Sequence, residues 1–174
     1  MLRKLHIGGE EPAPDWEILN ILPGPNVDHV GDAIDLSRFA DDTFIEIYAS
    51  HILEHIPYKQ KLEKAIGEWY RVLAPGGELY VSVPDLRTLA QLFLSEDLSI
   101  QQRHRVMRMM FGGQMNEHDF HYAGIYHEFL VAHLSNAGFV NLRRVAEFEF
   151  FDDDSRLRMH GVLISLNMIA QKPG

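Results

Sequence analysis

The chain has 174 residues, of which 46% are hydrophobic and 24% charged, a balance typical of one globular domain that buries its own core. It contains no cysteine, which excludes disulfides, thiolate nucleophiles and thiolate metal sites. Its formal net charge of -9 at pH 7 disfavours the wrapping of nucleic-acid phosphates.

The beginning of the chain predicts short strands without full helices between them. Apolar runs bounded by proline, glycine and asparagine predict strands over residues 4–8, 16–22 and 27–36. A fourth strand is expected over residues 44–49, "FIEIYA". Parallel crossovers need about a dozen residues or more, so we expect no full helix between Gly9 and Trp16.

From this point helices and strands alternate, which predicts an α/β fold with a mostly parallel sheet. Apolar residues recur at helical spacing at Leu62, Ile66, Trp69 and Leu73. We expect this helix to stop at "PGG", residues 75–77. The following run "ELYVSVP", residues 78–84, predicts an interior parallel strand.

Capping signals place three later helices. One is predicted up to residue 94 with Asp85 as its N-cap, and one over 99–110, where Ser99 and Gln102 stand at capping-box spacing. A third is predicted over 126–139, with Gly138 as its stop. Two strands follow, and they are separated by the acidic turn "DDDS"; they are expected over residues 140–151 and 161–171.

One short motif raises the question of metal chemistry. His51, Glu54 and His55 stand in the order H-x-x-E-H, which is the zinc signature of inverzincin peptidases. That chemistry requires both histidines on one face of a helix. Here the motif directly follows a predicted strand, and Pro57 comes soon after it. We therefore expect a strand-to-helix turn that binds no zinc.

The surroundings of this motif resemble a known family. "GDAIDLSRFADDTFIEIYASHILEHI" and "EWYRVLAPGGELYVSVPDL" resemble class I S-adenosylmethionine-dependent methyltransferases, in particular a small bacterial type 11-like branch. The resemblance implies a Rossmann-like sheet of strand order 3-2-1-4-5-7-6 with the last strand antiparallel. It implies a single domain over 1–174, reduced helices between strands one to three, and a helical cover at about 86–126.

The resemblance also implies S-adenosylmethionine as cofactor, bound at the carboxyl edge of the sheet. Gly8 and Gly9 correspond to the glycine-rich loop of the resembled family, although Glu10 occupies a position where glycine is usual. Asn20 stands where an acidic residue usually holds the ribose, and Asp32 where a carboxylate accepts from the adenine amino group. The full set of candidate cofactor residues is Gly8, Gly9, Asn20, Asp32, Ala33 and Ser50.

Two histidines are candidate catalytic residues. Methyl transfer needs mainly positioning, and a base is needed only for a poorly ionised acceptor. His51 follows the fourth strand and is a candidate base; its alternative is a structural contact. His121 and Tyr122 are expected to face the acceptor, with Arg105 or Arg108 near the rim. The other histidines around His121 predict a polar loop more than a metal site.

Three functions are compatible with these patterns. The favoured one is methyl transfer from S-adenosylmethionine to a small-molecule or glycan-type acceptor. The second is a catalytically inactive methyltransferase-like binding or scaffold module, which Glu10 and Asn20 keep open. The HxxEH zinc peptidase is a distant third. We expect no metal, no nucleic-acid or membrane partner and a cytoplasmic location; the acceptor and the oligomeric state stay open.

Overall fold

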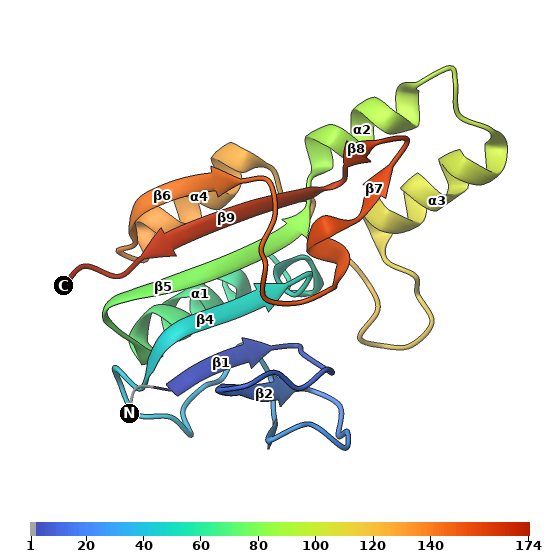
Figure 1. Ribbon diagram of the computed structural model, residues 1–174. Helices are drawn as coiled ribbons and strands as arrows, with labels where there is room; N and C mark the ends of the chain where they lie inside the picture. The colour runs from blue at the N-terminus through green and yellow to red at the C-terminus, as the bar shows by residue number, and fades with distance from the viewer. Residues whose placement is uncertain (1–2) are drawn as a thin grey trace.

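The computed structural model describes residues 3–174 and contains a seven-stranded sheet of order β3-β2-β1-β4-β5-β9-β6 (Figure 1). Its strands are β1 (Arg3–Ile7), β2 (Trp16–Asn20), β3 (His29–Val30), β4 (Phe44–Ser50), β5 (Leu73–Pro84), β6 (Val140–Val145) and β9 (Ser165–Gln171). Only β9 runs against the others, because both of its neighbours pair with it antiparallel. The predicted strand order and the antiparallel last strand are confirmed.

The remaining elements are helices and one small hairpin. The helices are α1 (Lys61–Val72), α2 (Leu86–Leu94), α3 (Ile100–Phe111) and α4 (His127–Asn136), with 3-10 turns η1 (Leu53–His55) and η2 (Asp154–Arg156). Strands β7 (Arg158–Met159) and β8 (Val162–Leu163) pair only with each other. None of the helices within residues 3–174 is both long and apolar enough to cross a membrane.

The first three strands follow one another without helices, as the spacing predicts. No helix lies between Gly9 and Trp16 in the structure. The third strand is shorter than expected, because only His29–Val30 pairs with β2. Its predicted continuation turns away where the carboxylate of Asp32 accepts a hydrogen bond from the Ile34 N–H at 3.0 Å. Such local side-chain bonds compete with strand pairing.

The boundary between α1 and β5 also differs from the prediction. The helix ends at Val72 and β5 begins at Leu73, before the "PGG" turn rather than after it. The ammonium group of Lys172 donates to the carbonyls of Tyr70 and Leu73 at 3.0 and 2.7 Å. It thereby satisfies carbonyls that a helix leaves unpaired at its end, which fixes the end of α1.

The two faces of the sheet are covered differently. Helices α1 and α4 lie against one face, whereas the chain between β6 and β7 crosses the other (Figure 1). There Phe148 packs with Tyr48, Tyr80 and Ile169 in an aromatic cluster. The strand predicted over 140–151 therefore ends at Val145, because the phenylalanines that follow cover the sheet instead of extending its edge.

The strand predicted over 161–171 is likewise divided. Val162–Leu163 turns back on Arg158–Met159 as a hairpin, and only Ser165–Gln171 joins the sheet. His160 and Gly161 form the turn with φ of +50° and +76°. The hairpin packs with α2 and α3 in a second apolar cluster. Both helices project beyond the end of the sheet (Figure 1), with the predicted Asp85 cap and Ser99–Gln102 capping box present.

Tyr48 anchors the crossing segment and provides a test of this packing. Its fully buried side chain donates from the hydroxyl to Asp153 Oδ2 at 2.8 Å. We expect Tyr48→Phe to lower the free energy of unfolding in urea denaturation by about 1.5–3 kcal/mol, the usual contribution of a hydrogen bond to a charged group. Tyr80→Phe is the control, since its hydroxyl bonds only the nearby Glu78. Equal losses in both variants would contradict this anchoring role.

Candidate functional site

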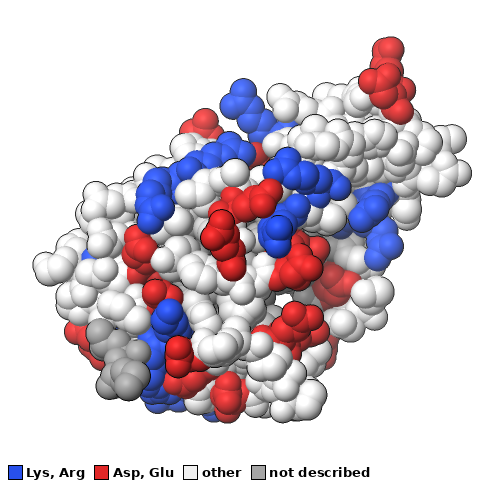
Figure 2. All heavy atoms as spheres, viewed as in Figure 1, with Lys and Arg blue, Asp and Glu red and all other residues white. Residues whose placement is uncertain are grey.

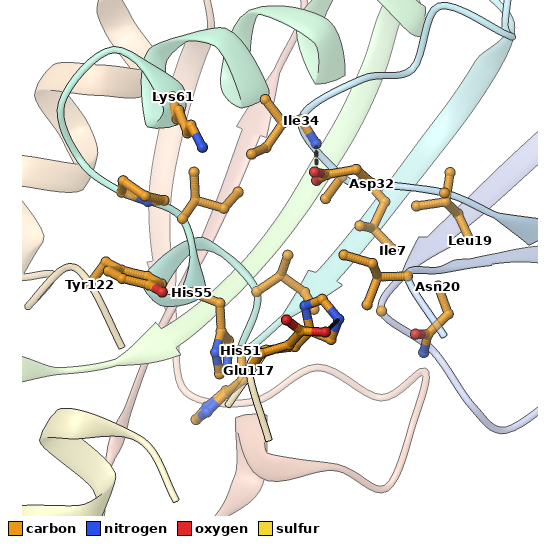
Figure 3. Close-up of a pocket in the computed structure, with 18 residues that line it drawn as sticks. Ile7, Leu19, Asn20, Asp32, Ile34, His51, His55, Lys61, Glu117 and Tyr122 are labelled. Atoms are coloured by element: carbon orange, nitrogen blue, oxygen red, sulfur yellow. Dashed lines mark hydrogen bonds and ion pairs between the residues drawn. The ribbon is translucent and has the colours of Figure 1, made fainter. Parts of the chain in front are cut away.

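The carboxyl ends of the first four strands surround one cavity of about 460 Å³, a size typical of small-molecule sites. Five of the predicted residues line it: Gly8, Asn20, Asp32, Ala33 and His51. Figure 3 shows Ile7, Leu19, Asn20 and Asp32 on one side and His51, His55 and Tyr122 on the other. The first three strand ends thus face the turn that follows β4.

Gly8 is required by its backbone and by a close neighbour. Its φ is +80°, a conformation that side chains with a Cβ rarely adopt. A Cβ there would lie 2.0 Å from Ile52 Cδ1, and Ile52 also lines the cavity. A Cβ on Gly9 would lie 2.4 Å from His6 Nδ1. Both glycines therefore allow tight packing of the loop after β1.

Asn20 and Asp32 have different roles in the cavity wall. The Asn20 amide donates to the Gly9 carbonyl at 3.0 Å and accepts from the Leu22 N–H at 3.0 Å. It therefore fastens the loop after β1 to the end of β2. Asp32 is exposed, and its Oδ1 caps Ile34 at the edge of the cavity (Figure 3). The Ala33 carbonyl accepts from the Trp69 indole at 2.9 Å, which holds this loop on α1.

Ser50 and Gly9 line a second cavity of about 360 Å³ on the other side of Gly8 and His51. Its wall includes five acidic residues: Glu10, Glu11, Asp152, Asp153 and Asp154. Figure 2 shows it as a hollow bordered by acidic side chains. Ser50 Oγ and His6 Nδ1 are buried and have no hydrogen-bond partner within residues 3–174. Burial lowers the pKa of His6 to about 4.

His51 stands where these cavities meet. It lines both of them and also a third cavity of about 260 Å³. Its Nε2 lies 2.9 Å from Ser165 Oγ, and that hydroxyl donates to the Asp154 carbonyl. Nε2 is therefore the protonated nitrogen, and Nδ1 keeps a free lone pair. Burial lowers the His51 pKa to about 4, so the imidazole is neutral near pH 7.

The third cavity contains a group that the sequence patterns did not single out. Glu54 is 1% exposed, and burial raises its pKa to about 8. Its Oε1 lies 3.5 Å from His51 Nδ1. The H-x-x-E-H spacing marked Glu54 as a metalloprotease residue, but not as a buried carboxyl beside His51.

The segment around His121 only partly follows its prediction. His121 lines the third cavity, whereas Tyr122 lines the first and is 53% exposed. The two side chains therefore do not face one common pocket. Arg105 and Arg108 line none of the three cavities, so their place near the rim stays a prediction. Helices α2 and α3 pack on the hairpin, because their apolar faces meet there.

The peptidase geometry is absent from the H-x-x-E-H segment. His51 has a φ of +55° directly after β4, and His55 lies in the 3-10 turn η1. The two histidines do not share an α-helix, which that zinc chemistry requires.

Comparison with known proteins gives one family match. Residues 20–81 match the family model described as "Methyltransferase domain". This range runs from the end of β2 into β5 and includes Asp32, Ser50 and His51. No curated protein matches the chain.

Solved structures show a shared fold at low sequence identity. An S-adenosylmethionine-dependent methyltransferase from Archaeoglobus fulgidus is 16% identical with a TM-score of 0.62, over 98% of this chain and 86% of that one. The N-methyltransferase NodS from Bradyrhizobium japonicum, solved with S-adenosylhomocysteine, is 16% identical with a TM-score of 0.60, over 99% and 79%. A possible exported protein from Bordetella parapertussis is 17% identical with a TM-score of 0.57; the chain spans 63% of it.

Proposed function

We propose that this chain, which shares the fold of solved methyltransferases and matches the methyltransferase-domain family model over residues 20–81, transfers a methyl group from S-adenosylmethionine to a small-molecule or glycan acceptor. One observation supports this most. Gly8, Asn20, Asp32 and His51 come from four different strand ends and line a single cavity. In open α/β sheets ligands bind at this edge, where the strand order reverses.

The residues that line the first cavity support the proposed cofactor. Ile7, Leu19 and Ile34 give it an apolar wall suited to an adenine ring, and the Asp32 carboxylate at the edge can accept from an amino group. When bound, S-adenosylmethionine supplies an electrophilic methyl group on a sulfonium. The chain's own part is to orient the two reactants and to exclude water from them.

The acidic second cavity bears on the acceptor. Carboxylates of residues 152–154 and of Glu10 and Glu11 would repel an anionic acceptor. We therefore propose a neutral or cationic acceptor, and His51 as the residue that contacts it and takes its proton. On the face in Figure 2, a band of lysines and arginines is interrupted and bordered by acidic side chains. The expectation of no nucleic-acid or membrane partner and of a cytoplasmic location belongs to this proposal.

Asp32→Ala tests the cofactor site. We expect the variant to bind S-adenosylhomocysteine roughly 5- to 150-fold more weakly by calorimetry, equal to about 1–3 kcal/mol for one lost polar contact. Asp35→Ala is the matched control, because Asp35 caps Ser37 in the same loop but does not line the cavity. If the wild-type protein binds neither S-adenosylmethionine nor S-adenosylhomocysteine at millimolar concentration, the result would favour the alternative of an inactive scaffold module.

A further inference from the structure

We propose that Glu54, His55 and His121 form a binding site for a divalent transition metal ion, with zinc as the best-matched ion. One ligand atom from each residue lies within 4.8 Å of the other two. Two imidazoles and one carboxylate are a frequent ligand set for catalytic zinc, which keeps a further position open for water or substrate. The site lies in the third cavity and does not depend on the proposed methyl transfer.

The backbone brings these distant residues together. The Glu54 carbonyl accepts hydrogen bonds from the N–H groups of Tyr122 and Ala123 at 2.8 and 3.2 Å. These bonds fix the loop that contains His121 against the η1 turn that contains Glu54 and His55. The placement of His121 thus follows from main-chain pairing and not from a chance side-chain contact.

The His55 imidazole is held in the way that metal-binding histidines usually are. His55 Nδ1 lies 3.2 Å from the Phe120 carbonyl, so Nδ1 bears the proton and Nε2 keeps its lone pair. The ring centroids of His55 and His121 lie 4.6 Å apart with the rings nearly perpendicular.

Glu54 provides the observation that points to a bound ion. Its carboxyl is 1% exposed, and neither oxygen has a hydrogen-bond partner within residues 3–174. A buried carboxyl without partners is costly, and such groups in folded proteins usually have a bound water or ion as partner, or a functional role. A divalent ion between Glu54 and the two imidazoles would give both oxygens a partner.

The proposal differs from the peptidase hypothesis in its ligands. The proposal departs from the expectation that this turn binds no zinc. That expectation was based on His51 and His55 as a helical pair, and His51 is not a member of the present set. His121 lies far along the chain, in a segment where the sequence favoured a polar loop over a metal site. The remaining walls of the cavity include Asp119 and Asp154, which add negative charge near the ion.

Zinc titration of tag-free, chelator-treated protein tests this site. We expect one zinc ion per chain by calorimetry and elemental analysis, together with a rise in melting temperature. Glu54→Gln and His121→Ala should each weaken zinc binding by about 100-fold or more, beyond the roughly 10- to 100-fold effects of residues that only orient ligands. His104→Ala is the control, since it removes an exposed imidazole from α3 and should bind zinc as wild type does.

Two results would overturn the proposal. One is the absence of zinc binding by the wild-type chain at millimolar concentration. The other is unchanged zinc affinity in both Glu54→Gln and His121→Ala, which would place any bound zinc elsewhere. Glu54→Gln keeps the shape of the side chain and removes the carboxylate that would bind the ion, so it is expected to fold; its circular dichroism spectrum checks this.

Discussion

Gly8→Ala is expected to abolish measurable binding of S-adenosylhomocysteine and to lower the free energy of unfolding by about 2–5 kcal/mol. Part of this loss is backbone strain, since φ at Gly8 is +80° and left-handed backbone costs roughly 1–2 kcal/mol for a residue with a Cβ. The rest is steric, because the new methyl group would lie 2.0 Å from Ile52 Cδ1. Overpacking of this kind costs about 1–3 kcal/mol. Ile52 would have to move, and it forms part of the cavity wall.

Two further variants separate these causes. Gly67→Ala is the matched control, because Gly67 lies in α1 with nothing within 4 Å of the added methyl group; it should stabilise the chain by about 0.5–1 kcal/mol. Ile52→Ala combined with Gly8→Ala removes the clash and should restore part of the stability. Wild-type cofactor affinity in Gly8→Ala, measured by calorimetry, would show that the loop after β1 does not hold the cofactor.

The second large effect is expected at His51. His51→Asn should reduce methyl transfer by about 100-fold or more, the usual contribution of a positioned acid or base, while affinity for S-adenosylhomocysteine changes by less than about threefold. Asparagine is chosen because it tolerates the φ of +55° better than other residues. The rate of methyl transfer is measured as the rate at which S-adenosylhomocysteine is released. The acceptor is the best one found in a panel of small amines and glycans.

His160→Asn is a closely matched control for that variant. His160 also has a left-handed φ, of +50°, but it is exposed and lines none of the three cavities. The His160→Asn variant should therefore transfer methyl groups at the wild-type rate. If His51→Asn lost cofactor binding and activity in parallel, His51 would be a structural contact of the turn and not a residue that meets the acceptor.

Much of the fold could be predicted because its signals are local. The Asp85 and Ser99–Gln102 caps depend on residues three positions apart or fewer, and both are present. The strand order came from the family resemblance together with the short spacing of the first strands. The cover of the second sheet face could not be predicted, because Phe148 reaches Tyr48 through a contact between residues about a hundred positions apart.

The site was predictable only to the level of strand ends. The rule that ligands bind there pointed to Gly8, Asn20, Asp32 and His51, and these four residues line one cavity. It could not place Ser50, which lines a different cavity because successive strand residues point to opposite faces. It also could not predict that the Asn20 amide is used within the protein. The approach of His121 to Glu54 depends on long-range backbone pairing, for which a single sequence has no signal.

Hydrogen exchange with and without S-adenosylhomocysteine tests the central claim most directly, since it reports binding and location together. If the cofactor binds at the ends of the first four strands, added S-adenosylhomocysteine should slow exchange in residues 8–11, 31–34 and 51–56 and leave α2 unchanged. Unchanged exchange in all three segments, or protection confined to α2 and α3, would contradict the account.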